Sequence, residues 1–154
     1  MSEISDPFDG FLAAYQAASS MVFERIEEAC ARPRDWPRRV GEAVGSVLAL
    51  FTEDPELARL VLFGAYSAGG FAQLRHEEAL GRLASLLREG RDWAAAEPPE
   101  VLEIGLVGSA VFVVGAALRS GEPRTLADLT PELVVLILTP YVGTDEAERV
   151  AAGE

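Results

Sequence analysis

Histidine and cysteine, two residue types that often perform catalysis, each occur once in this sequence, and the two positions lie far apart. The chain has one histidine, His76, and one cysteine, Cys30. The segment "HEE" at residues 76–78 lacks the second histidine, four residues later, that the helix of a zinc protease needs. No Ser–His–Asp arrangement can be proposed around His76, and the carboxylates lie mainly on polar faces, where solvation accounts for them. We therefore expect no enzyme activity, catalytic residue, metal site or cofactor.

The composition indicates one globular domain with an acidic surface. The 154 residues are 49% hydrophobic and carry a formal net charge of −12, which is enough chain for one substantial core. Such a surface repels phosphate, so we expect no DNA or RNA binding by these residues alone. A single cysteine suits a reducing compartment, and residues 1–10 show no secretion signal. We expect one domain over residues 1–154 and a cytoplasmic location.

Two late segments are apolar enough to raise the question of a membrane. The run "DLTPELVVLILTPYVG" at residues 128–143 is too short, because a spanning helix needs about 20 mostly apolar residues. Residues 101–118 come closer, but they include Glu103. A helix that is apolar all round is also typical of a buried helix, so we expect no membrane insertion.

Helices must position all of these residues, because apolar side chains recur at intervals of three and four along the chain. Aspartate caps and prolines in first turns mark several helix starts. The starts fall at Asp6-Pro7, Asp35, Asp54-Pro55, Phe71, Pro99 and Thr130-Pro131, and a short seventh helix follows in "DEAERVAA". Thr130 or Asp128 is expected to cap the sixth helix, and Gly121 to end the fifth. The polar stretch "REGRDWAAAEPPE" predicts a loop. The fold class is therefore all-α, with about seven helices.

The fifth and sixth expected helices each have two apolar faces. One face of the fifth carries three glycines, together with Val101 and Phe112. Glycine inside a helix costs about 1 kcal/mol relative to alanine, so this face favours the close approach of another backbone. One core covers only one face of each helix. The second face is covered either by the remaining helices or by a second copy, in a dimeric four-helix bundle.

Three segments share their order and spacing with a known family. They are "FLAAYQAA", "DWPRRVGEAVGSVLALFTEDPELARLVL" and "GEPRTLADLTPELVVLILTPYVGTDEA". Together they resemble the C-terminal ligand-binding and dimerisation region of TetR-family (TetR/AcrR) transcriptional regulators. The resemblance runs from about residue 4 to residue 150, and it implies a domain that binds a small, usually apolar ligand inside its first five helices.

The resemblance also implies a homodimer. The last two long helices, here residues 101–120 and 130–142, would pair across a two-fold axis, and the ligand would control the DNA binding of helix-turn-helix heads. The implied interface residues are Gly105, Gly108, Phe112, Leu133, Val134, Ile137, Leu138 and Tyr141.

Polar and aromatic residues on core-facing stripes are the candidates for lining the ligand pocket. They are Tyr15, Ser19, Phe51, Phe63, Tyr66, His76 and Phe112. Aromatic side chains also dominate ordinary cores, and a lone histidine on an apolar stripe is commonly a core residue, so packing remains an alternative at each position.

The sequence departs from the family at its start. The segment "ISDPFDGFLAAY" stands where the family joins its DNA-reading domain to the ligand domain, and Pro7 replaces the usual lysine. We therefore expect DNA contact only through a domain absent from this sequence. A start codon assigned too late, a trimmed sequence and a protein that lacks the domain are all compatible with this departure. Two alternatives stay open: a stand-alone partner that heterodimerises with a full-length relative, and an all-α protein of unrelated function.

Overall fold

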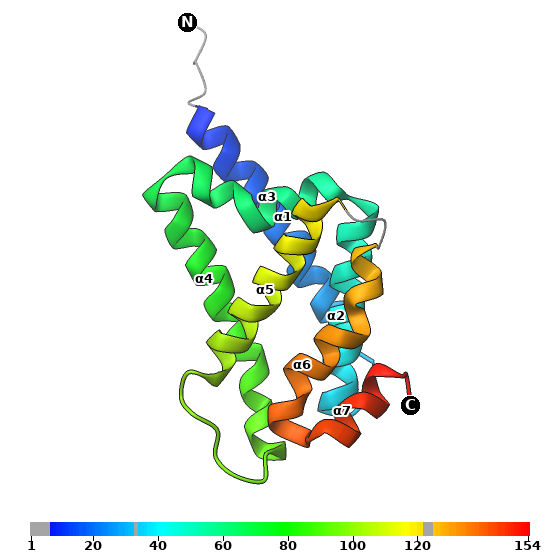
Figure 1. Cartoon of the computed structure of the whole chain (residues 1–154). Coiled ribbons are helices and arrows are strands. Elements are labelled where there is room, and N and C mark those ends of the chain that lie inside the picture. Colours follow the sequence, from blue (N-terminus) through cyan, green and yellow to red (C-terminus); the bar gives the residue numbers. More distant parts are fainter. Residues whose placement is uncertain (1–6, 33, 122–124) are drawn as a thin grey trace, which may run out of the picture.

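Helices make up nearly the whole of the structure (Figure 1). This computed structural model describes residues 7–32, 34–121 and 125–154, and within these ranges it contains seven α-helices, two 3₁₀ helices and no strand. The elements are α1 (Pro7–Cys30), α2 (Trp36–Glu53), α3 (Pro55–Ala68), α4 (Gly70–Leu87), η1 (Arg88–Trp93), α5 (Leu102–Ser120), η2 (Leu126–Leu129), α6 (Thr130–Val142) and α7 (Thr144–Ala151). The predicted all-α fold of about seven helices is confirmed.

Aspartate caps fix the first turns of α2 and α3, as the sequence predicts. The Asp35 carboxylate accepts a hydrogen bond from the backbone N–H of Arg38 at 3.1 Å, and Asp54 accepts one from Leu57 at 3.1 Å. These bonds satisfy amide groups that have no partner within the helix. At the other end of a helix, Gly121 adopts φ +63° after α5, which confirms the predicted C-cap. The predicted cap Asp6 lies outside the described residues.

The predicted cap of the sixth helix is wrong. Thr125 and Asp128 cap each other's backbone around η2, and α6 then begins at Thr130 without a side-chain cap. Asp128 does act as a capping residue, but it caps the 3₁₀ helix that precedes α6.

The predicted loop at residues 88–100 also begins differently, with the 3₁₀ helix η1. Gly90 of this helix is buried against the indole of Trp36, and a Cβ atom at Gly90 would collide with that ring. Tertiary packing therefore orders a segment whose composition is that of a loop.

The helices enclose two connected cores. α1 packs on α2 and α3, α2 on α6, α4 on α3 and α5, and α6 on α7. Figure 1 shows α4 along one side of the molecule and α6 with α7 toward the opposite side, with α5 between them. The smaller core lies where α2, α5, α6 and α7 meet, and it is formed by Trp36, Leu106, Val134, Leu138, Tyr141, Ala147 and Val150.

This packing changes which part of α6 can face a partner. All five α6 residues expected at a dimer interface are buried within the chain: Leu133, Val134, Ile137, Leu138 and Tyr141. α2, α5 and α7 already surround them, so the α6 face predicted to contact a second copy lies inside the chain. The α6 side that reaches the surface carries Leu136, which is 39% exposed.

α5 is the one described helix long and apolar enough to cross a membrane by length and composition. This helix of 19 residues contains an apolar stretch with a mean hydropathy of 1.7, and 28% of that stretch is buried inside the fold. A single helix of this kind is not enough to indicate a membrane protein, since core helices of other proteins have the same composition.

Candidate ligand-binding cavity

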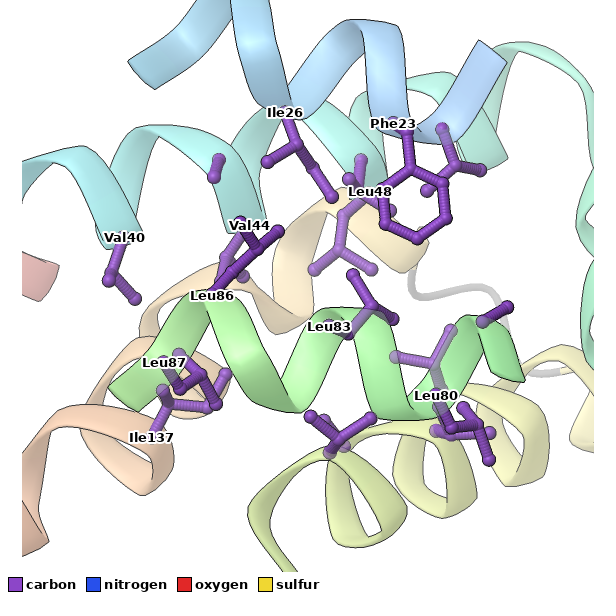
Figure 2. Close-up of a pocket in the computed structure, with 18 of the residues that line it drawn as sticks. Phe23, Ile26, Val40, Val44, Leu48, Leu80, Leu83, Leu86, Leu87 and Ile137 are labelled. Carbon is purple, nitrogen blue, oxygen red and sulfur yellow. The ribbon is translucent and has the colours of Figure 1, made fainter. Parts of the chain in front are cut away.

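A cavity of about 350 Å³ lies among the helices α1 to α6. Small-molecule sites in proteins typically measure about 300–1,000 Å³, so this volume is sufficient for a compact ligand. Figure 2 shows the hydrocarbon walls, and the side chains that it labels come from α1, α2, α4 and α6. They are Phe23, Ile26, Val40, Val44, Leu48, Leu80, Leu83, Leu86, Leu87 and Ile137. Leu86 is 48% exposed at its edge, so the cavity is not sealed from solvent at α4.

One end of the cavity is polar. The hydroxyl of Tyr15, on α1, lies 3.1 Å from Nδ1 of His76, on α4, and both residues are buried. Ser19 follows Tyr15 by one helical turn and also lines the cavity. Within the described part of the chain, the buried Ser19 Oγ and His76 Nε2 have no hydrogen-bond partner.

Burial keeps this polar end uncharged. It lowers the pKa of His76, so the imidazole is neutral at neutral pH, with one nitrogen as donor and the other as acceptor. Burial also raises the pKa of Tyr15 more than the neighbouring Ser19 hydroxyl lowers it, which keeps the phenol protonated. The polar end of the cavity can therefore form hydrogen bonds but offers no charge to a ligand.

Arg39 and Glu89 contribute formal charges to the lining, and they pair with each other. The guanidinium Nη2 of Arg39 lies 2.7 Å from Oε1 of Glu89. Burial raises the pKa of the nearby Cys30 thiol, which also lines the cavity. This pairing leaves the Arg39 Nε as a buried donor without a hydrogen-bond partner in the described structure, and the rest of the lining is mainly hydrocarbon.

The α4 wall is joined to α1 by side chains. Besides the Tyr15–His76 contact, the guanidinium of Arg82 lies 3.9 Å above the ring of Phe23 and 3.6 Å from the carboxylate of Glu27. These contacts cross the space between the two helices and hold the wall in place.

The structure gathers four of the seven predicted pocket residues around the cavity: Tyr15, Ser19, Phe51 and His76. The other three lie elsewhere. Phe63 packs against Gly115, and the guanidinium carbon of Arg119 lies 4.9 Å from the centroid of the Phe63 ring. Tyr66 is 66% exposed, with its ring centroid 5.7 Å from that of His76, and Phe112 is 69% exposed on α5.

Most of the wall was not among the predicted pocket residues, although the sequence contains its signal. Val40, Val44 and Leu48 form the apolar stripe of α2, and Leu80, Leu83 and Leu87 form that of α4. A stripe shows which face is inward but not whether that face meets a neighbour or a space. Leu133 and Ile137, expected at the dimer interface, also line the cavity.

Fold and site together define an all-α domain built around an apolar cavity. Among the described residues, no three or more His, Cys, Asp or Glu side chains are grouped so that they could hold a metal ion. Comparison of the chain with protein-family models, with curated proteins and with solved structures found no match. The family resemblance of the sequence therefore stays a prediction.

Proposed function

We propose that this chain is the regulatory part of a TetR-type transcriptional regulator. It binds a small apolar ligand in the cavity, dimerises through α5 and the exposed side of α6, and controls DNA binding by a helix-turn-helix domain outside these 154 residues. The observation that carries the proposal is the apolar cavity with one buried, uncharged polar end.

An unfilled cavity lowers the stability of the folded state. Mutational series relate cavity volume to stability at about 24 cal/mol per Å³. For about 350 Å³, this gives on the order of 8 kcal/mol as an upper bound, because the cavity is partly open. That is comparable with the total stability of a typical domain, about 5–15 kcal/mol. A fold that keeps such a space is best explained by a ligand that occupies it.

The outer face of α5 supports the dimer. Val101 and Phe112 are each 69% exposed, and Gly105 and Gly108 lie between them with open space where a Cβ would be. No charged residue occurs in this helix between Glu103 and Arg119. In a two-fold pair, the Phe112 ring of one copy can therefore enter the glycine groove of the other.

The two tryptophans of the chain allow a direct test of ligand binding. Trp36 lines the cavity, whereas Trp93 is exposed in η1. A Trp93→Phe variant leaves Trp36 as the only indole, and titration with the neutral apolar fluorophore N-phenyl-1-naphthylamine should quench it saturably, with one site per chain. The expected dissociation constant is micromolar.

A matched pair of variants locates the probe. Ala79→Phe, in the Trp93→Phe background, places a ring in the cavity and should weaken binding at least tenfold. Ala84→Phe makes the same change on α4 at a half-buried position outside the cavity, and should leave binding unchanged. Absence of saturable binding, or equal effects of the two variants in folded protein, would contradict the ligand-binding proposal.

A further inference from the structure

The polar end of the cavity specifies more than an apolar ligand. We propose that the ligand is an elongated, uncharged hydrocarbon with an oxygen-containing head group, which Ser19 and His76 bind at the polar end. This inference rests on the proposed ligand-binding function and adds the chemical class of the ligand. The observation behind it is a pair of buried polar atoms beside a mainly hydrocarbon space: His76 Nε2, which has no hydrogen-bond partner, and Ser19 Oγ, which has none in good geometry although it lies near the Tyr15 hydroxyl.

The two atoms belong to one end of the cavity because Tyr15 connects them. Tyr15 and Ser19 share one face of α1 at a spacing of four residues. The Tyr15 hydroxyl contacts Nδ1 of His76, so the second ring nitrogen is left for another partner. Buried polar groups in native proteins nearly always have a hydrogen-bond partner, and a ligand in the cavity can supply one to both atoms.

The hydrogen-bonding capacity of the site points to oxygen in the head group. When the Tyr15 O–H donates to Nδ1, the neutral imidazole of His76 carries its proton on Nε2 and becomes a donor. The Ser19 hydroxyl can donate as well as accept. A hydroxyl or carbonyl oxygen, with two lone pairs, can accept from both residues at once.

The polar end of the described lining offers no charge that could pair with a charged head group. Arg39 and Glu89 neutralise each other on contact, and the groups at the polar end are a phenol, a hydroxyl and an imidazole. Burying a carboxylate or an ammonium group without an opposite charge is strongly unfavourable. The lowered pKa of His76 reinforces this selection, since the ring does not supply a cation at neutral pH.

The shape of the lining accounts for the hydrocarbon part. Along α1 and α4, the lining continues from Tyr15 and His76 to Phe23 and Leu83. Figure 2 shows the labelled walls from Phe23, past Leu83, to Val40 and Leu87. They offer dispersion contacts to a hydrocarbon chain, and apart from the polar end the hydrogen-bonding side chains of the described lining are those of Cys30, Trp36, Arg39 and Glu89. A flexible ten-carbon chain is therefore a suitable probe of this space.

Competition at pH 7 tests the head group. In the Trp93→Phe protein, 1-decanol, decanoate and decylamine would each displace N-phenyl-1-naphthylamine, read through Trp36 quenching. We expect 1-decanol to bind at least tenfold more tightly than either charged analogue. Equal or tighter binding of decanoate or decylamine would overturn the inference.

Matched serine variants test the residues. Ser19→Ala should weaken 1-decanol binding about five- to tenfold and leave N-phenyl-1-naphthylamine within twofold of its original affinity. Ser20→Ala, at the adjacent exposed position, should change neither, and His76→Phe should reproduce the Ser19→Ala result if the variant folds. Equal 1-decanol affinity in Ser19→Ala and Ser20→Ala would show that no head group is bound there. If the fluorophore nevertheless binds, and Ala79→Phe abolishes that binding, the proposed ligand-binding function is still supported. If the fluorophore does not bind at all, both proposals are rejected.

Discussion

At the scale of single residues, Arg91 and Glu103 form a largely buried ion pair with several hydrogen bonds. The guanidinium of Arg91 donates to both carboxylate oxygens of Glu103, at 2.7 and 2.9 Å, and also to the backbone carbonyls of Pro98 and Pro99. The Glu103 side chain is almost completely buried. One arginine therefore fastens the connection before α5 to the first turn of that helix, and explains why an acidic residue is tolerated in so apolar a segment.

This pair predicts a pH-dependent contribution to stability. Hydrogen bonding from Arg91 lowers the pKa of Glu103 from its ordinary value of 4.5. Because the carboxyl group binds its proton less tightly in the folded state, it stabilises the fold above pH 4.5 and this contribution is lost as the pH falls through the lower folded-state pKa. Glu103→Gln should therefore reduce the free energy of unfolding at pH 7, by an amount that shrinks below pH 4.5.

Urea titrations between pH 3 and pH 7 measure this difference. Glu148→Gln, an exposed position on α7, is the control and should change stability little at any pH. A difference between the wild-type protein and Glu103→Gln that stays constant across the range would show that the ion pair does not determine it.

At the scale of elements, the junction between α3 and α4 depends on one glycine. Gly69 adopts φ +95° and ψ −173°, a conformation open essentially to glycine alone, whereas Gly70 begins α4. Gly69→Ala should lower the free energy of unfolding by about 1–3 kcal/mol through backbone strain. Gly70→Ala is the matched control, with open space around its Cβ, and should be neutral or stabilising by up to about 1 kcal/mol. Similar losses in both variants, measured by urea unfolding, would contradict this assignment.

The start and end signals of several helices could be predicted from the sequence because they are local. Asp35, Asp54 and Gly121 act through bonds or backbone angles within a few residues of their own helix. The cap assigned to Thr130 failed because a 3₁₀ turn precedes α6, and such a turn uses the same residue types as a helix start. The helix count and the fold class follow from the periodicity alone.

The rotation of each helix about its axis could not be predicted in the same way. The periodicity of α3 and α5 does not show which apolar face meets the cavity, so Phe63, Tyr66 and Phe112 were expected there along with residues that do line it. On α6, both faces are apolar, and the positions of α2 and α7 show that Tyr141 lies inside the chain. These choices depend on contacts between segments distant in sequence, which no local pattern contains.

At the scale of the whole molecule, α5 connects the two candidate sites. Its Val107 and Val111 line the cavity, while Gly108 and Phe112 face outward on the same two turns. A helix moves as a unit over such a short distance, so a ligand that displaces Val111 also displaces Phe112. If binding changes the dimer affinity, thermodynamic linkage requires dimerisation to change the ligand affinity by the same factor.

The outer face of α5 then predicts the effect of a single charge on assembly. Phe112→Asp places a carboxylate where the two copies would meet, opposite the uncharged glycine groove of Gly105 and Gly108, and buried unpaired charges are strongly unfavourable. We expect the dimer dissociation constant to rise at least about 30-fold, as for an interface residue worth 2 kcal/mol or more. Leu74→Asp is the matched control, since Leu74 is an apolar residue that is 50% exposed on another helix, α4. Sedimentation equilibrium at micromolar concentration should show a dimer for the wild-type chain and for Leu74→Asp, and a monomer for Phe112→Asp. A wild-type monomer would reject the homodimer and leave α5 to pair with a related chain, and a Phe112→Asp dimer would place the interface elsewhere.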